Sequence, residues 1–188
     1  GLDLSRWMVA LCGAEPVHLA TLDRFVERFA AVGLRPEALT PVYGLAEATL
    51  AVTFTDLSKP FTRLVGSRDS IEKNRCFEPL EGGHEWVSVG KPIPGHSVKI
   101  CDGERQLDEG FVGRVWACGP GIMQGYLDDA EATSEILVDG WLDTGDEGFL
   151  WNGELYLTGR AKDLIILRGR NHDPAVIEQA IDGIEGLR

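Results

Sequence analysis

The sequence predicts a mixed fold in which the end of an α/β layer is joined to a β-rich, barrel-like subdomain. Two observations carry this prediction: a strand–helix pattern in the first 33 residues, and a series of short strand patterns between residues 85 and 160. A third observation, an apolar run at 163–169 followed by a helix-start signal, predicts a further strand and the start of a helix near the end of the chain.

The strand–helix pattern begins with an apolar run, Trp7–Cys12, that ends at Gly13. Pro16 then suits the first turn of a helix, because proline lacks the N–H that this turn leaves unpaired. Gly33 is a suitable C-terminal stop for that helix. The helix would present one apolar stripe at positions i, i+3, i+4 and i+7, formed by Leu22, Phe25, Val26 and Phe29.

The next 50 residues carry less pattern. A short element leads into residues 41–52. Residues 55–85 mix charges with Pro60, Pro79 and a Gly82–Gly83 pair, and they show little periodicity. We therefore expect an irregular insertion or loop at 55–85.

From Glu85 onward, the spacing of apolar residues becomes that of short β-strands. Asn152-Gly153 between two such strands is a strong signal for a type I′ hairpin. One helix is expected at about Asp129–Val138, and another begins at Asp173-Pro174, where Asp is the N-cap and Pro the first helical residue. The strand candidates are 85–90, 96–102, 113–119, 141–151, 154–159 and 163–169.

Composition narrows the class of protein. The 188 residues are 44% hydrophobic and 26% charged, as in a globular protein, with a formal net charge of −12. Such an acidic chain repels phosphate backbones, which argues against nucleic acid as a partner, although a local pocket can still hold a nucleotide. No apolar run reaches the ~18 residues that a transmembrane helix needs.

The cysteines and the first residues suggest a setting for the chain. Four cysteines with no Cys-x-x-Cys spacing suit free thiols in a reducing compartment, so we expect a cytoplasmic location. No signal peptide opens the chain, which starts at Gly1 and enters directly on a strand pattern. We therefore expect an internal piece of a longer protein.

Five short motifs have residue types suited to a nucleotide site. A Gly–Pro turn between a strand and a helix lies where an open α/β sheet binds ligands. A tyrosine can stack on a base, and a carboxylate suits Mg²⁺. The motifs are Gly13–Pro16 (GAEP), Tyr43–Glu47 (YGLAE), Gly119–Gly121 with Gly125-Tyr126, Trp141–Asp146 (WLDTGD) and Thr158–Asp163 (TGRAKD).

The last two motifs contribute Asp146 and Arg160. An ionised carboxylate is an acceptor with two oxygens, which matches the two vicinal hydroxyls of a ribose. A guanidinium donates to ribose or phosphate oxygens in a fixed geometry. Each motif alone also suits an ordinary turn, a core tyrosine or a surface ion pair, and only the ordered set favours the nucleotide site.

The ordered set resembles the adenylate-forming superfamily of acyl-CoA synthetases, peptide-synthetase adenylation domains and luciferases. Within it, YGLAEATL at 43–50 and KDLIILRGRNH at 162–172 look most like the fatty acyl-AMP ligases. The resemblance implies a fold with a large α/β domain, a distorted β-barrel subdomain and a small C-terminal α+β domain. It also implies an ATP- and Mg²⁺-dependent reaction in which a carboxylate attacks the α-phosphate, giving acyl-AMP and pyrophosphate.

The resemblance assigns roles residue by residue. Glu47 would be the magnesium ligand and, with Arg160, a catalytic residue. Asp146 would bind the ribose hydroxyls beside Arg160, and Lys162 would be the interdomain hinge. The remaining nucleotide contacts implied are to the adenine, by Gly13, Ala14, Glu15, Pro16 and Tyr43, and to the α-phosphate and acyl carbonyl, by the backbone of Gly44, Leu45 and Ala46.

The resemblance also divides the chain. Residues 1–75 would end the large α/β subdomain, with the insertion at about 55–85. Residues 76–160 would form the barrel-like subdomain, and residues 161–188 the hinge and the start of the C-terminal domain. The phosphate-binding loop would lie upstream of this chain and the catalytic lysine downstream, so we expect little or no turnover from these 188 residues alone.

The acyl acceptor distinguishes the possible reactions. Tyr43 and Gly90 are 47 positions apart, a long run that resembles the insertion of the AMP-forming ligases. We therefore favour an enzyme that forms a fatty acyl adenylate, with CoA or an acyl carrier protein as acceptors to consider. The alternatives are an acyl-CoA synthetase that forms the thioester, and a catalytically inactive adenylation-like domain that binds an acyl adenylate or a carrier protein.

Overall fold

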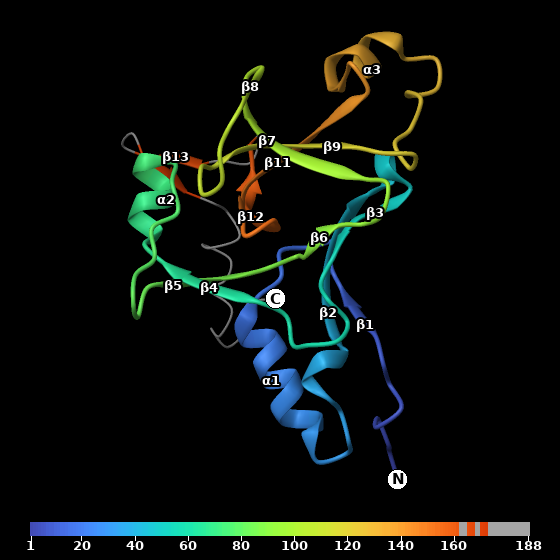
Figure 1. Ribbon diagram of the computed structural model, residues 1–188, viewed down its shortest axis with the longest axis vertical. Helices are drawn as coiled ribbons and strands as arrows, with labels where there is room; N and C mark the ends of the chain where they lie inside the picture. Colours follow the sequence, from blue (N-terminus) through green and yellow to red (C-terminus); the bar gives the residue numbers. More distant parts are fainter. Residues whose placement is uncertain (162–164, 168–169, 173–188) are drawn as a thin grey trace.

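The computed structural model describes residues 1–161, 165–167 and 170–172 (Figure 1). It is a mixed α/β structure with several sheets, as the sequence predicts. The helices are α1 Leu19–Ala30, α2 Arg68–Asn74 and α3 Ala130–Ile136, with two 3-10 helices, η1 Pro36–Ala38 and η2 Ala46–Ala48. The strands are β1 Ala10–Cys12, β2 Leu39–Leu45, β3 Leu50–Phe54, β4 Arg63–Gly66, β5 His84–Val87, β6 Lys91–Pro92, β7 Ser97–Asp102, β8 Arg105–Gln106, β9 Gly113–Cys118, β10 Leu137–Val138, β11 Trp141–Trp151, β12 Glu154–Arg160, β13 Ile165–Leu167 and β14 Arg170–His172.

The first 45 residues form a β–α–β crossover. β1 pairs with β2 in parallel, and α1 connects them. Leu22 on α1 is buried with Ala10 and Leu39 from the two strands, and Phe25 and Val26 pack against the same cluster, so three of the four residues in the predicted stripe face the sheet. The helix starts at Leu19 rather than near Pro16, because Ala14 adopts a left-handed φ of 68° and turns the chain before the helix begins.

The chain then builds a four-stranded sheet in the order β1-β2-β3-β6. β2, β3 and β6 pair antiparallel, and η2 forms the connection between β2 and β3. β3 and β6 are separated by the whole of β4, α2 and β5 along the chain, yet they lie side by side (Figure 1). The motif Tyr43–Glu47 therefore occupies the end of a central strand and the 3-10 turn behind it.

A six-stranded sheet forms the second layer. Its order is β10-β11-β9-β7-β8, and β12 pairs with β11 off this path. One face is apolar and buried, as Ile100, Val115 and Leu142 show. Neighbouring positions point to the outer face, where the ammonium nitrogen of Lys99 lies 4.1 Å from the centre of the Trp141 ring.

One hydrophobic cluster joins the two sheets. It contains Tyr43 and Val52 from the four-stranded sheet and Ile100, Val115 and Leu155 from the six-stranded sheet. Both sheets thus share a core, and this shared core brings the end of β2 against the inner face of β11. The position of the candidate site follows from this packing.

The predicted hairpin between β11 and β12 is confirmed. Asn152 and Gly153 have φ values of 53° and 73°, and Trp151 pairs with Glu154 across the turn. Positive φ at both central residues is the requirement of a type I′ turn. The predicted helix at about Asp129–Val138 also forms, as α3 with Asp129 as its N-cap.

The stretch 55–85 is more regular than the sequence suggests. β4 pairs antiparallel with β5, and α2 lies between them with Ser67 as its N-cap. α2 has seven residues and buries two of them, Ser70 and Ile71. Two turns with so few buried positions produce no recognisable period, which is why the sequence predicted a loop.

A second cluster, which we call the aromatic cluster, supports the other end of the six-stranded sheet. It is centred on Phe149, whose ring stacks on Phe77 at 5.2 Å and on Tyr156 at 5.3 Å. Trp86 meets Phe149 edge to face at 6.3 Å. Such offset and edge-to-face pairs stabilise beyond the area they bury.

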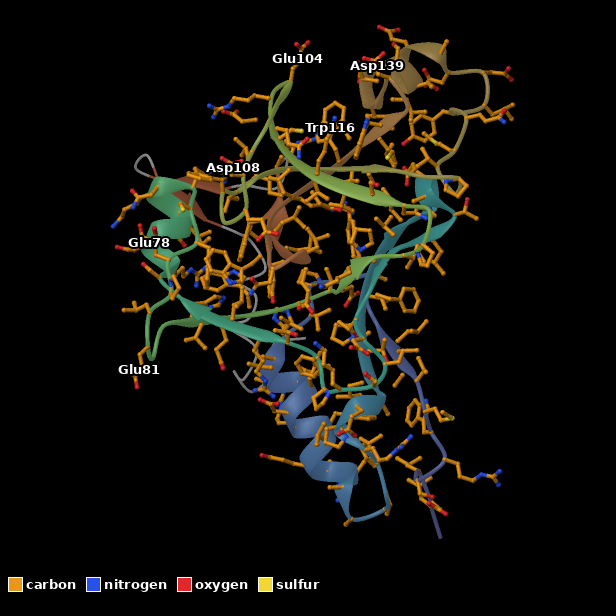
Figure 2. All side chains as sticks on the ribbon, in the orientation of Figure 1. Glu78, Glu81, Glu104, Asp108, Trp116 and Asp139 are labelled. Atoms are coloured by element: carbon orange, nitrogen blue, oxygen red, sulfur yellow. The ribbon has the colours of Figure 1, made fainter. Side chains whose placement is uncertain are left out.

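The surface carries the excess negative charge. Figure 2 shows the labelled residues Glu78, Glu81 and Glu104 at the edges of the view, and all three are exposed, as is Asp108. All four cysteines are free thiols. Across the described part of the chain, no helix has the length and apolar character to cross a membrane. The predicted helix at Asp173-Pro174 lies outside the described residues.

Removing the centre of the aromatic cluster should destabilise the fold. We expect Phe149→Ala to lower the free energy of unfolding by about 3–5 kcal/mol, because a fully buried ring leaves a cavity. Urea denaturation measures this. The matched control is Leu127→Ala, since Leu127 is 92% exposed and should change stability by less than about 0.5 kcal/mol. Equal effects of the two substitutions would contradict the assignment of the cluster.

Candidate functional site

Two of the motifs lie together at one edge of the first sheet. β1 and β2 are parallel, with Cys12 opposite Pro41. Gly13 directly follows β1 and Tyr43 lies near the end of β2, so both are at the same edge of the sheet. A Cβ on Gly13 would lie 2.7 Å from the carbonyl oxygen of Val42, so only glycine fits there. The carboxyl edge of parallel strands is where α/β sheets bind ligands.

The motif Gly13–Pro16 forms an exposed turn at that edge. Gly13, Ala14, Glu15 and Pro16 are all exposed. Ala14 has a left-handed φ of 68°, which is uncommon for a residue with a side chain. Backbone strain of this kind concentrates at ligand sites, where the surrounding structure holds it in place.

Asp146 reaches the same region from the six-stranded sheet. Its Oδ2 accepts a hydrogen bond from the hydroxyl of Tyr43 at 2.6 Å, across 103 positions of sequence. Its Oδ1 accepts from Nε of Arg160 at 3.1 Å. Asp146 and Arg160 are direct partners in the β11–β12 register, so the hairpin sets their contact. Three of the residues proposed for the nucleotide therefore form one hydrogen-bonded group.

An irregularity in β11 turns Asp146 inward. The pairing of β11 with β9 shifts register between Asp143 and Glu147. Thr144 fills this break by donating its hydroxyl to the carbonyl of Val115 at 2.8 Å and accepting from the N–H of Asp146 at 3.2 Å. Gly145 sits in the break with φ 83°. The segment is thus a bulge within a strand, rather than the ordinary turn that this motif alone would also suit.

Burial determines how this group behaves. Tyr43 and Asp146 are 6% and 9% exposed, whereas the Arg160 side chain is 70% exposed. Burial, followed by the charge of Asp146, raises the pKa of the Tyr43 hydroxyl well above its usual range. Tyr43 therefore stays protonated and donates to the carboxylate at neutral pH.

The arrangement leaves acceptor capacity at Asp146. Each carboxylate oxygen accepts one hydrogen bond from a side chain, and a carboxylate has about four lone-pair positions. Tyr43 and Arg160 hold the carboxylate in one orientation. Two neighbouring hydroxyls of a sugar could then donate to its two oxygens, so the residues present fit a ribose.

Glu47 lies on η2, which directly follows the strand that carries Tyr43, and it is half-buried. Its Oε1 accepts a hydrogen bond from the hydroxyl of Tyr126 at 2.7 Å. Within the described residues, no group of three or more His, Cys, Asp or Glu side chains is placed to hold a metal. A single carboxylate nevertheless fits Mg²⁺ where substrate phosphates supply further ligands, which is the usual arrangement for nucleotide-bound Mg²⁺.

The backbone between Tyr43 and Glu47 is constrained by glycine. A Cβ on Gly44 would lie 1.6 Å from the carbonyl oxygen of Leu50, so no other residue fits. Leu45 packs against the shared core, and Ala46 is exposed on η2. Gly44–Ala46 thus connect Tyr43, which holds the Asp146 carboxylate, to Glu47. Lys162, the expected hinge, lies outside the described residues.

Two residues of this region were not assigned a role from the sequence. Tyr126 belongs to a motif that the sequence singles out, but nothing in the sequence pairs it with Glu47, 79 positions away. Thr144 occupies the bulge, and strand periodicity does not reveal a bulge. Both contacts depend on tertiary packing.

Comparison with known proteins gives a consistent result. A family model described as AMP-binding enzyme matches residues 1–127. The chain is 39% identical over 196 residues to the medium-chain-fatty-acid–[acyl-carrier-protein] ligase JamA of Moorena producens (strain JHB), covering 96% of this chain and 33% of that protein. It is 37% identical over 205 residues to the long-chain-fatty-acid–AMP ligase FadD26 of Mycobacterium tuberculosis (strain H37Rv), covering 100% of this chain and 35% of that protein.

A solved structure from work on fatty acyl-adenylate ligases of E. coli and L. pneumophila superposes with a TM-score of 0.91 at 40% identity, covering 98% of this chain and 34% of the other. The chain spans about a third of the length of the curated relatives it matches. The family model covers more than half of the chain, and the residues linked around Asp146 are those that the resemblance selected. This chain belongs to the AMP-binding family of adenylate-forming enzymes, and fatty acyl-AMP ligases are among its relatives.

Proposed function

We propose that a protein carrying this chain activates a fatty or similar carboxylic acid as its acyl adenylate, using ATP and releasing pyrophosphate. The observation that carries the proposal is the hydrogen-bonded group of Tyr43, Asp146 and Arg160, which offers a buried, oriented carboxylate to a ribose. The names of the relatives support the substrate class, since those proteins are fatty acid ligases.

The proposed reaction is a displacement at phosphorus. An oxygen of the substrate carboxylate forms a bond to the α-phosphorus of ATP, and the bond from that phosphorus to the pyrophosphate oxygen breaks. Asp146 would fix the nucleoside through its ribose hydroxyls, so that the α-phosphate lies near the backbone of Gly44–Ala46. Positioning of this kind supplies much of the rate enhancement of a two-substrate reaction. Bound Mg²⁺ would neutralise charge on the phosphates, and Glu47 is the residue that would hold it.

Arg160 would act from the exposed side of Asp146. Its guanidinium donates through Nε to Asp146, and its other N–H groups carry no hydrogen bond to the described residues. A guanidinium presents five donors, so the remaining ones can reach ribose or phosphate oxygens. Arg160 would thereby link the sugar contact to the developing negative charge at the phosphate.

The adenine contacts remain predictions within this proposal. The exposed turn at Gly13–Pro16 offers backbone groups at the right edge of the sheet. The ring of Tyr43 lies in the shared core at 6% exposure, which supports an orienting role for its hydroxyl more directly than a stacking role for its ring. We therefore propose that Gly13–Pro16 make most of the contacts with the adenine.

Finer features of the fold and setting belong to the same proposal. We propose that the six-stranded sheet is the family's distorted barrel-like subdomain and that residues 161–188 include the hinge at Lys162 and the start of the C-terminal domain. The boundaries near residues 75 and 160 stay predictions, as does a cytoplasmic location.

The acceptor is the point at which the candidates differ. FadD26 is named an AMP ligase, and JamA is named an acyl-carrier-protein ligase. Both names, together with the ordered segment β4–α2–β5 between Tyr43 and Gly90, favour release of an acyl adenylate to a carrier protein over a CoA thioester. The catalytically inactive binding domain is the second candidate, and retention of Glu47, Asp146 and Arg160 argues against it.

Substituting the ribose carboxylate should weaken nucleotide binding. In a protein that carries this chain at the length of its relatives, we expect Asp146→Ala to raise the Kd for ATP about 10- to 100-fold, because hydrogen bonds to a charged group are lost. Isothermal titration calorimetry measures this. Asp146→Asn keeps the side-chain volume and guards against a loss of folding, and Asp108→Ala at an exposed position is the control. An unchanged ATP affinity in both Asp146 variants would remove this residue from the site.

The reaction itself is tested by pyrophosphate exchange with a panel of carboxylic acids, with and without CoA, in the same longer protein. We expect exchange that depends on a fatty acid, and acyl-AMP as the product whether or not CoA is present. Acyl-CoA accumulating as fast as acyl-AMP would overturn the adenylate-only assignment. Absence of exchange with every acid, in a protein that binds ATP, would favour the inactive binding domain.

A further inference from the structure

The loop that follows β9 holds η2, the short helix that carries Glu47. The backbone N–H of Met123 donates to the carbonyl of Glu47 at 2.7 Å. The hydroxyl of Thr49 donates to the carbonyl of Gly121 at 2.6 Å. The hydroxyl of Tyr126 donates to Oε1 of Glu47 at 2.7 Å. One loop of the second sheet thus contacts both the backbone and the side chain of the proposed magnesium ligand.

η2 has little intrinsic rigidity. It has only three residues, and it is followed by two left-handed residues, Thr49 with φ 53° and Leu50 with φ 83°. A side chain on so short a helix has no neighbouring turn to restrict it. The orientation of the Glu47 carboxylate therefore depends on the contact with Tyr126.

Tyr126 is itself fixed from the other side. Its backbone N–H donates to Oγ1 of Thr133 at 2.9 Å, and that hydroxyl donates to the carbonyl of Asp129 at 2.7 Å. Thr133 is on α3, and Asp129 caps the same helix through the N–H of Ala132. The backbone of Tyr126 is thus anchored to the first turns of α3, and this anchor determines where the phenol lies relative to Glu47.

Burial distinguishes this tyrosine from the other two. Each of the three tyrosines donates to a carboxylate: Tyr43 to Asp146, Tyr126 to Glu47 and Tyr156 to Glu154. Tyr43 and Tyr156 are 6% and 1% exposed, so their hydroxyls need a protein partner. Tyr126 is 41% exposed, and water could satisfy its hydroxyl. Its bond to Glu47 is therefore not needed to satisfy a buried group.

The contact engages one side of the carboxylate. Among the described residues, Tyr126 is the sole side chain that donates to Glu47, and it does so at Oε1. Oε2 carries no hydrogen bond from these residues. A cation can then bind at the free oxygen while the first one is held.

We propose that Tyr126 is a positioning residue that aims the free oxygen of Glu47 at the Mg²⁺ of a bound nucleotide. This inference rests on the proposed function, because it takes Glu47 as the magnesium ligand. Groups that hydrogen-bond a metal ligand set its orientation and basicity, and their loss commonly weakens metal binding about 10- to 100-fold.

The test measures metal affinity directly. A protein that carries this chain at the length of its relatives is saturated with a non-hydrolysable ATP analogue, and Mn²⁺ is titrated in place of Mg²⁺. The electron paramagnetic resonance signal of free Mn²⁺ then gives the Kd of the metal. The variants are Tyr126→Phe, which removes one hydroxyl, Glu47→Gln, which removes the carboxylate, and Tyr156→Phe, the same chemical change at a tyrosine–glutamate pair away from η2.

We expect Tyr126→Phe to raise the Kd of the metal about ten-fold, at the low end of the usual range because the contact is partly exposed. Glu47→Gln should weaken the metal further, and Tyr156→Phe should leave its affinity unchanged. Affinity for the analogue without metal should be the same in the wild type and in the Tyr126 variant. That comparison separates positioning of the metal ligand from general damage to the site, and thermal unfolding verifies that the variants are folded.

Two outcomes would overturn the inference, and they differ in what else they overturn. If Glu47→Gln weakens the metal but Tyr126→Phe does not, the positioning role fails while the proposed function stands. If neither substitution alters the Kd of the metal, Glu47 is not the ligand, and that part of the proposed function fails together with the inference.

Discussion

The hydrogen bond from Tyr43 to Asp146 is the contact on which the site depends. It joins β2 of one sheet to β11 of the other, and both side chains are almost fully buried. A buried carboxylate without partners would be strongly unfavourable, so the pair constrains how the two sheets meet. Arg160 adds a second donor from the exposed side. The same hydrogen bond that stabilises the packing therefore also fixes the orientation of the Asp146 carboxylate.

The rest of the site is arranged around that junction by close backbone approach. Gly44 allows β2 and β3 to come together where a Cβ would collide with Leu50, and Gly13 does the same between the end of β1 and Val42. η2 then turns Glu47 toward the loop that contains Tyr126. Apart from the exposed turn at Gly13–Pro16, the residues proposed for the nucleotide lie on strands or on η2. Contacts between these elements, rather than the elements alone, determine how the side chains are oriented.

Family membership and the site geometry support each other but establish different things. The comparisons show that the chain belongs to the AMP-binding family and that its relatives include fatty acyl-AMP ligases. Geometry explains why Asp146 and Arg160, two residues 14 positions apart, act as one unit: they are direct partners across a hairpin closed by Asn152-Gly153. The reaction, the acid and the acceptor follow from neither and are the subject of the proposals.

The sequence by itself determined much of the local structure and selected the candidate site residues, whose roles stay predictions. The period-2 strands at 141–151 and 154–159, the Asn-Gly turn and the helix at about 129–138 were predicted correctly, because turn chemistry and alternation act over a few residues. Tertiary structure alone decided the start of α1, the regular segment within 55–85, the bulge that turns Asp146 inward and the pairing of Tyr126 with Glu47. These features depend on contacts between residues as far as 103 positions apart, and no local pattern encodes such contacts.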